Sequence, residues 1–334
     1  MSAPAPSAAG LVVAADGSGD ARTVQEAVDL APSGSAHRFI IRIEAGVYRG
    51  QVHVGPDRPN LAFVGGTGDP ADVVIVDDRA NGTPHPDGGT WGTAGSATLT
   101  VAGDGFAARD VTFANDFDDA AHPELAASRQ AVAVRTLADR VLFERVRFLG
   151  HQDTLFLDTS AVEVPARVYL RDCWIEGDVD FVFGRATAVV ERSTIRALAR
   201  DATPSGYLLA PSTTAGRPHG FLVTDSRLVS DAPPGTYHLG RPWHPSSAPD
   251  NDPRVVVRDS YLGAHLRRPD AWAPMHGYEW TPGRYAELHN RGPGALLTPR
   301  RPQLDADHAW AHTADAYLAG DDGWAPRRDG ARRG

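Results

Sequence analysis

Six stretches of the chain align with one another without gaps, and this repeat limits the possible folds more than any other feature. The aligned stretches are AARDVTFAN (107–115), LFERVRFLG (142–150), YLRDCWIEG (169–177), VVERSTIRA (189–197), LVTDSRLVS (222–230) and VVRDSYLGA (256–264). The fifth position reads Val, Val, Cys, Ser, Ser, Ser, and the seventh reads Phe, Phe, Ile, Ile, Leu, Leu. Side chains two positions apart lie on the same face of a strand, so each copy is interpreted as one short strand.

The spacing of the copies predicts a stacked architecture. Successive copies begin 35, 27, 20, 33 and 34 residues apart, which is too irregular for a propeller. Short strands joined by loops of variable length are typical of a right-handed parallel β-helix, an all-β solenoid. The alternative is an all-β sandwich whose alternating segments align by chance. In the solenoid interpretation, one domain spans 11–320, between a flexible tail at 1–10 and a disordered tail at 321–334.

Two segments outside the repeat have helical patterns. In TVQEAVDLAP, Thr23 and Glu26 have capping-box spacing, and Pro32 ends the helix, which caps the N-terminal side of the solenoid. Near the other end, DADHAWAHTADAYLAG (305–320) predicts an amphipathic helix within a segment of helix and loop. We expect this helix to cover the C-terminal end of the solenoid, with its histidines in solvent.

Composition excludes several classes of function. The net charge is −9 and no basic run occurs, which argues against nucleic-acid binding. No run approaches the ~20 apolar residues of a membrane span. All 33 cationic residues are arginine, so lysine chemistry is excluded. The only cysteine, Cys173, is expected to be a small buried residue, and without CxxC or HExxH spacing we expect no metal and no cofactor.

The start of the chain does not decide the compartment. MSAPAPSAAG has neither the charged nor the apolar part of a signal peptide. Either the protein is intracellular, or a secretion signal has been removed.

The sequences GHQDTLFLD and GDVDFVFGR place two aspartates before apolar strands, where burial of charge is costly. Asp153 lies five residues after Phe148, and Asp180 lies five residues after Ile175, and these two apolar residues share one repeat position. Parallel strands lie about 4.8 Å apart, so in-register carboxylates on adjacent coils come within roughly 5 Å of each other. Gln130 precedes AVAV in the same way, which predicts a column of Gln, Asp and Asp.

Two carboxylates at this distance cannot both ionise cheaply, so one pKa should rise while the other stays low. Such a pair suits a nucleophile beside a proton donor. A similar separation serves a retaining glycosidase. The amides of Gln130 and Gln152 favour acyl transfer, because they can donate N–H groups to a developing oxyanion.

The sequence that contains these residues resembles the pectin methylesterase (pectinesterase) family. The similar stretches are RQAVAVRTLADRVLFERVRFLGHQDTLFL, DCWIEGDVDFVFG and LGRPWHPSS, with weaker similarity at DGSGDARTVQEAVDLAP, IEAGVYRGQVHV and HNRGPGALLTPR. Together they run from residue 16 to about residue 300. QDTL, DFVFG and LGRPW at their mutual spacing are highly specific.

The resemblance implies a role for each matching residue. Asp180 corresponds to the nucleophile, Asp153 to the general acid and then base, and Gln130 and Gln152 to the oxyanion donors. Arg241 corresponds to the arginine that pairs with the nucleophile. Trp243 corresponds to an aromatic residue that packs on a sugar ring, although it can also be explained as a residue that covers a coil of the solenoid. The resemblance also implies the fold of the family's members, a right-handed β-helix, and an activity that needs no metal.

Two residues next to the site depart from the family pattern. Phe156 stands where tyrosine is common, and Arg185 stands where asparagine often follows DFIFG. Both are expected to contact substrate and to alter its preference.

The resemblance therefore implies a secreted, monomeric enzyme that hydrolyses the methyl esters of galacturonate units in pectin (homogalacturonan), releasing methanol. The alternatives are a glycosidase or lyase acting on polygalacturonan, and a solenoid that binds pectin without catalysis. A lyase would need a cage of clustered acids for calcium, and the Asp pairs of this chain fall at unrelated repeat positions.

Overall fold

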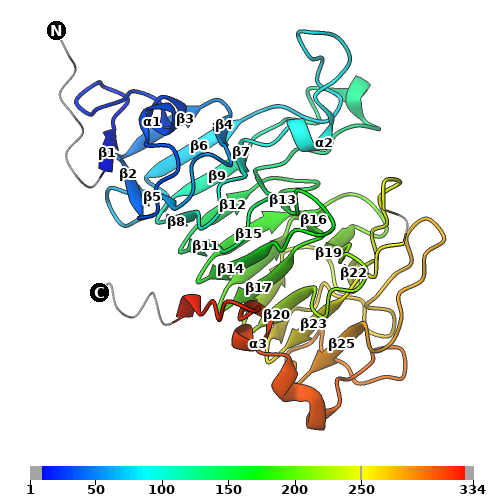
Figure 1. Ribbon diagram of the computed structural model, residues 1–334. Helices are drawn as coiled ribbons and strands as arrows, with labels where there is room; N and C mark the ends of the chain where they lie inside the picture. The colour runs from blue at the N-terminus through cyan, green and yellow to red at the C-terminus, as the bar shows by residue number, and fades with distance from the viewer. Residues whose placement is uncertain (1–9, 249, 328–334) are drawn as a thin grey trace, which may run out of the picture.

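The computed structural model describes residues 10–248 and 250–327, and its strands form a parallel β-helix (Figure 1). Each full coil contributes one strand to each of three parallel sheets before the chain begins the next coil. The solenoid predicted from the repeat is confirmed, and the sandwich alternative is not.

We call the three sheets A, B and C. Sheet A has ten strands: β1 (Gly10–Val13), β2 (Phe39–Ile43), β5 (Leu61–Gly65), β8 (Ala107–Arg109), β11 (Val141–Glu144), β14 (Arg167–Arg171), β17 (Thr187–Glu191), β20 (Phe221–Thr224), β23 (Val255–Arg258) and β25 (Tyr285–Leu288). Sheet B has eight: β3 (Gly46–Arg49), β6 (Val73–Asp77), β9 (Thr112–Asn115), β12 (Arg147–Leu149), β15 (Trp174–Gly177), β18 (Thr194–Ala197), β21 (Arg227–Ser230) and β24 (Tyr261–Leu262). Sheet C has seven: β4 (Val52–Val54), β7 (Leu99–Val101), β10 (Val134–Thr136), β13 (Leu155–Leu157), β16 (Val179–Gly184), β19 (Gly206–Pro211) and β22 (Tyr237–Gly240).

The helical segments are short. They are α1 (Val24–Leu30), α2 (Gly92–Gly95), α3 (Ala314–Leu318) and the two 3₁₀ turns η1 (Pro123–Leu125) and η2 (Ala306–Ala311).

The register of the strands reproduces the sequence alignment. First repeat positions pair in sheet A, as in Leu142 with Tyr169, and seventh positions pair in sheet B, as in Phe148 with Ile175. One detail differs from the prediction. Each copy contains two short strands, one in sheet A and one in sheet B, because the chain turns a corner at the fourth position.

The corner has a specific backbone conformation. The fourth-position residues all have positive φ, as in Asp110 (57°), Arg145 (52°), Asp172 (56°) and Arg192 (49°). This left-handed conformation bends the strand, and Asp tolerates it better than most residues do. Short segments with the alternation of a single strand therefore include a turn.

At the fifth repeat position, the change from valine to serine along the solenoid is explained by hydrogen bonds between coils. The hydroxyl of Ser193 accepts a hydrogen bond from the backbone N–H of Cys173 (3.0 Å) and donates one to the carbonyl of Glu191 (2.9 Å). Ser226 accepts from the backbone N–H of Ser193 at 3.1 Å, and Ser260 accepts from that of Ser226 at 3.0 Å, so each serine accepts from the preceding coil. This serine column satisfies buried backbone amides inside the solenoid. Cys173 itself is buried, as expected.

The N-terminal helix matches its prediction. Thr23 and Glu26 form the capping box of α1, and the helix buries Val24, Ala27 and Val28 in the core. Residues 1–9 of the expected N-terminal tail lie outside the described residues, whereas Gly10 already belongs to β1.

The C-terminal segment lies in a different place from the one predicted. Instead of closing the end of the solenoid, α3 packs on the outer face of sheet A, against β17 and β14, as Figure 1 shows. Tyr317 and Leu318 bury apolar surface there with Tyr169 and Val189. The histidine prediction also fails for His312, which is half-buried and hydrogen-bonded to the Tyr317 hydroxyl (2.9 Å).

Residues 321–327 of the predicted C-terminal tail contact the solenoid through two ion pairs. Asp322 pairs with Arg167 at 2.6 Å, and Arg327 pairs with Glu191. Residues 328–334 of that prediction lie outside the described residues. Among the helices that the structure describes, none is long and apolar enough to cross a membrane.

Candidate active site

The two predicted aspartates lie on adjacent coils at the start of sheet C. β13 pairs with β16 so that Leu155 is level with Val182, and counting back two residues brings Asp153 level with Asp180. The backbone N–H of Asp153 donates to the carbonyl of Val179 at 3.0 Å. Both aspartates have positive φ, 69° and 51°. Such strained residues persist where the surrounding structure holds them, often at functional sites.

The environment separates the two carboxyl groups electrostatically. Asp153 is 8% exposed and Asp180 is 6% exposed. Burial, followed by the charge of Asp180, raises the pKa of Asp153 well above its usual value. Burial also raises the pKa of Asp180, but Arg241 opposes this effect. A neutral Asp153 beside an anionic Asp180 is therefore the favoured arrangement.

Arg241 holds Asp180 through both carboxylate oxygens. Its Nε donates to Oδ1 at 2.8 Å and its Nη2 donates to Oδ2 at 2.6 Å. The guanidinium also lies over the ring of Tyr207, with 3.7 Å between Cζ and the ring centroid. The arginine is thereby fixed from two sides, and Asp180 is aimed by a planar fork.

Gln130 and Gln152 line the same pocket as the aspartates, a pocket of about 440 Å³. The side-chain oxygen of Gln130 accepts a hydrogen bond from Nδ2 of Asn81 at 2.9 Å. This contact occupies the oxygen and leaves the amide N–H groups of Gln130 available to a ligand. Asn81 lies in the loop between β6 and α2, which has no periodic pattern, so no sequence signal indicated this role.

The predicted Gln–Asp–Asp column is wrong in its first member. The backbone N–H of Ala131 donates to the carbonyl of Gln152 at 3.0 Å, so Ala131 is level with Asp153 and Gln130 lies one residue before that level. Gln130 reaches the pocket from the segment before β10. The column fails because an extra residue enters the pairing between Ala131 and Val134, which is level with Leu155.

Aromatic side chains form one wall of the pocket. The rings of Phe156 and Phe183 stack with centroids 4.2 Å apart, and Trp243 packs edge-on against both, at 5.8 and 5.3 Å. Trp243 is half-buried and lines the pocket, so it covers sheet C and faces the open space as well. Phe183, within DFVFG, belongs to the site and was not singled out from the sequence.

Arg185 also lines the pocket, but its charge is already paired. Its Nε and Nη2 donate to the two oxygens of Asp158, at 2.5 and 2.9 Å, and Nη2 donates to the carbonyl of Thr159 at 3.0 Å. Gly184 directs the chain there with a φ of 126°, and a Cβ on it would lie 2.0 Å from the carbonyl oxygen of Leu157. Glycine is therefore required before Arg185.

Some residues of the site had no clear signal in the sequence. Met275 and His276 line the pocket from the irregular segment after β24, and the charge of His276 favours the ionised form of Asp180. His151 contacts Asp178 at 3.2 Å, and this contact raises the pKa of His151. Among the residues that the structure describes, no group of three or more His, Cys, Asp or Glu is arranged to hold a metal ion.

The site combines a carboxylate held by an arginine, a second buried carboxyl group with a raised pKa and two glutamine side chains beside an aromatic wall. The family model for pectinesterases matches residues 10–321. This chain belongs to the pectinesterase family. A pectinesterase from Ralstonia nicotianae is 34% identical over 86% of this chain and 80% of the relative.

Solved pectin methylesterases share the fold. The enzyme from Erwinia chrysanthemi superposes with a TM-score of 0.82 at 30% identity, covering 96% of this chain and 99% of that chain. A pectin methylesterase in complex with a hexasaccharide superposes with a TM-score of 0.80 at 31% identity, covering 94% of this chain and 97% of that chain. These comparisons support the β-helix and the family assignment made from the sequence.

Proposed function

We propose that this protein hydrolyses the methyl esters of galacturonate units in pectin, with Asp180 as the nucleophile. The observation that carries the proposal is the asymmetry of two adjacent buried carboxyl groups, one held by Arg241 and one without a cationic partner within hydrogen-bonding distance in the described residues. Membership of the pectinesterase family supports the substrate class. No step requires a metal or a cofactor.

In the first half-reaction, a carboxylate oxygen of Asp180 attacks the ester carbonyl carbon. The carbonyl oxygen becomes an oxyanion and accepts hydrogen bonds from the side-chain N–H groups of Gln130 and Gln152. Loss of one such donor typically costs about 3 kcal/mol of barrier. The contact with Asn81 holds the Gln130 amide so that its N–H groups, rather than its oxygen, are free to face the carbonyl.

Protonated Asp153 supplies the proton for the leaving group. When the tetrahedral intermediate collapses, the bond between the carbonyl carbon and the methoxy oxygen breaks. Asp153 donates its proton to that oxygen, and methanol leaves. An acyl-enzyme remains on Asp180. The carboxylate of Asp153 then removes a proton from water, which attacks the acyl carbon and releases Asp180 and galacturonate. Each turnover returns Asp153 to its neutral form.

Substrate contacts come from the aromatic wall. Trp243 offers an apolar face for a sugar ring, and Phe156 and Phe183 support it from below. Because Arg185 is paired with Asp158, we propose that its exposed edge contacts the polymer while its charge is largely neutralised. The hexasaccharide complex of a related enzyme supports a polymer that extends beyond the reacting unit.

Hydrolysis of the glycosidic bond is the alternative that the carboxylate spacing alone would allow. The orientation of Gln130 by Asn81 favours ester cleavage, because an oxocarbenium-like sugar presents no oxyanion for amide donors. A non-catalytic pectin-binding solenoid would have no use for a nucleophile held by Arg241.

The decisive experiment measures two products on two polymers. We expect methanol from highly methylated pectin, and no new reducing ends from polygalacturonate. Reducing ends without methanol would transfer the assignment to a glycosidase. If neither methanol nor new reducing ends are formed, the result favours the non-catalytic solenoid.

We further propose that the protein acts as a monomer outside the cell, on methyl-esterified homogalacturonan and not on nucleic acid or membranes. The substrate is a cell-wall polymer too large to enter a cell, and the net charge of −9 disfavours nucleic acid. Sedimentation of the purified chain, with and without pectin fragments, tests the oligomeric state.

A further inference from the structure

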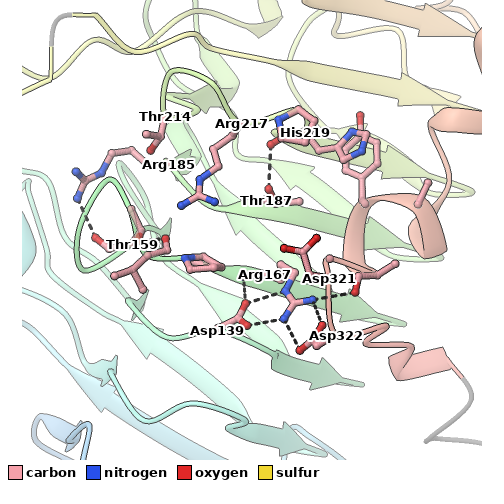
Figure 2. Close-up of a pocket in the computed structure, with 18 residues that line it drawn as sticks. Asp139, Thr159, Arg167, Arg185, Thr187, Thr214, Arg217, His219, Asp321 and Asp322 are labelled. Atoms are coloured by element: carbon pink, nitrogen blue, oxygen red, sulfur yellow. Dashed lines mark hydrogen bonds and ion pairs between the residues drawn. The ribbon is translucent and has the colours of Figure 1, made fainter.

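A second pocket, of about 620 Å³, lies beside the active site (Figure 2). It is enclosed by three loops or segments that are far apart in the chain. These are the loop at 159–166 after β13, the loop at 214–219 after β19, and the C-terminal segment at 316–322. The position of the C-terminal segment on sheet A, which the sequence did not predict, is what closes this space.

Arg217 is the cation that extends into the middle of this pocket, as Figure 2 shows. Its Nη2 donates to the backbone carbonyl of Val162 at 3.1 Å. Within the described residues it forms no ion pair with a carboxylate. Most of its guanidinium donors therefore remain available to a ligand.

Two further polar atoms of the pocket wall are buried without a partner. The hydroxyl of Thr214 has no hydrogen bond within the described residues, and that residue is 5% exposed. Nδ1 of His219 is unpaired in the same way, while its ring stacks on Tyr317 at 4.2 Å. Burial lowers the pKa of His219 to about 4, so the ring is neutral at neutral pH. Unsatisfied buried polar groups are costly unless a ligand or water satisfies them.

Most of the acids around the pocket are already neutralised. Arg167 binds Asp139 at 2.6 Å and Asp322 at 2.6 Å, and Arg140 also contacts Asp322 at 3.2 Å (Figure 2 shows the first two). Asp321 is the acid of the wall for which the described residues provide no ion pair. The wall thus offers one unpaired cation, Arg217, opposed by one exposed carboxylate.

The pocket adjoins the active site at Arg185. This residue lines both pockets, and it binds Asp158 and the carbonyl of Thr159. Arg217 therefore lies in a pocket that shares one wall residue with the active site. A demethylated unit carries a carboxylate, whereas a methylated unit does not, so an arginine there can distinguish product from substrate.

We propose that this second pocket binds de-esterified galacturonate units, with Arg217 as the residue that binds their carboxylate. The inference rests on the proposed function, which generates these units next to the pocket. The hydroxyl of Thr214 and Nδ1 of His219 hydrogen-bond to the sugar hydroxyls. The side chains of Val164, Pro165 and Pro218 provide apolar contacts for the ring.

The test is a calorimetric titration with fully de-esterified trigalacturonate. This ligand is short, so that separate molecules can bind to the two sites. It carries no ester, so it is not hydrolysed during the titration. Wild type should bind two molecules per chain. Arg217→Gln should lose the second site, with affinity there reduced at least about tenfold. Trp243→Ala should lose the other site and keep this one. Asp321→Asn should tighten the second site, because it removes the opposing carboxylate.

Matched variants separate binding from general damage. Thr214→Val should weaken only the second site, and thermal melting should verify that it folds. Arg227→Gln removes an exposed arginine of sheet B and should retain both sites. Identical titrations for wild type and Arg217→Gln, or loss of all binding in Trp243→Ala, would overturn the second site. Absent methanol release from wild type would instead overturn the proposed function, so the two failures are distinguishable.

Discussion

The corner between sheets A and B and the start of sheet C both stack residues with positive φ on successive coils, but the charges that meet there differ. At the corner, Asp110 meets Arg145 at 2.7 and 2.9 Å, and Asp172 meets Arg192 at 2.9 and 2.6 Å. In the pocket, Asp153 meets another aspartate, Asp180. Opposite signs make the corner pairs Asp110–Arg145 and Asp172–Arg192 mutually stabilising, whereas equal signs make the pocket pair costly when both members are charged.

Exposure increases this difference. The side chains of Asp172 and Arg192 are 34% and 53% exposed, so water screens their interaction. The pocket pair is almost fully buried, and Arg241 forms an ion pair with only one of its two carboxyl groups, that of Asp180. The same local backbone conformation therefore gives a structural link in one place and a strongly perturbed pKa in the other. The pairing of charge, rather than the conformation, marks the functional site.

The largest effect is expected from Asp180→Asn, which removes the nucleophile and the like charge together. Methanol release should fall by at least a factor of about 10³, because no other group can form the acyl-enzyme. The variant should fold, since Asn is nearly the same shape and still accepts a hydrogen bond from Arg241. Circular dichroism and a methanol assay check both points, and near-normal turnover would refute the assignment.

The next effect concerns the stability of Asp153→Asn as a function of pH. Because the pKa of Asp153 is raised in the folded chain, that chain keeps its proton at pH values where the unfolded chain has released it. Wild-type stability therefore falls as pH rises above the unfolded value of about 3.9 toward the folded pKa. The variant lacks this loss, so it should be more stable than wild type at pH 7, by about 1 kcal/mol, although less active.

Urea unfolding at pH 4 and pH 7 measures this difference. The gain should be present at pH 7 and largely absent at pH 4. A variant with the same pH dependence as wild type would show that Asp153 is not the group that holds the proton.

The smallest effects are expected at the corner. Asp110→Asn breaks a paired carboxylate that is 4% exposed, and should cost about 1 kcal/mol of unfolding free energy. Asp172→Asn removes a more exposed pair and should cost less than about 0.5 kcal/mol. Both variants should retain methanol release. A large loss of activity in either would remove the distinction between the two columns.

The sequence predicted the features that repeat and missed those that do not. The seventh-position register placed Asp153 beside Asp180 correctly, because strand pairing propagates the alignment from coil to coil. Gln130 was assigned to the wrong level, since the hydrophobic pattern does not reveal the extra residue in the pairing between Ala131 and Val134. Arg241 is 61 residues from its partner in the chain, and only the family resemblance suggested the contact.

Irregular segments explain the remaining failures. Asn81, which contacts Gln130, and His276, which lines the pocket, both come from loops without a period, so no pattern specified where they point. The amphipathic segment at 305–320 indicated an apolar face to bury, and the face of sheet A satisfied that need as well as the solenoid end would have done. A hydrophobic pattern predicts that the apolar face of a helix is buried, but it does not predict against which surface.

The serine column has a consequence for how such a chain can change. Ser193, Ser226 and Ser260 complete the hydrogen bonds of their neighbours inside the solenoid, and all three lie at the corner between sheets A and B. The connections from sheet C to sheet A, which wall both pockets, are remote from these contacts and already differ in length, as 158–166 and 185–186 do. New loops can therefore remodel substrate contacts on that side while the interior remains free of unsatisfied amides.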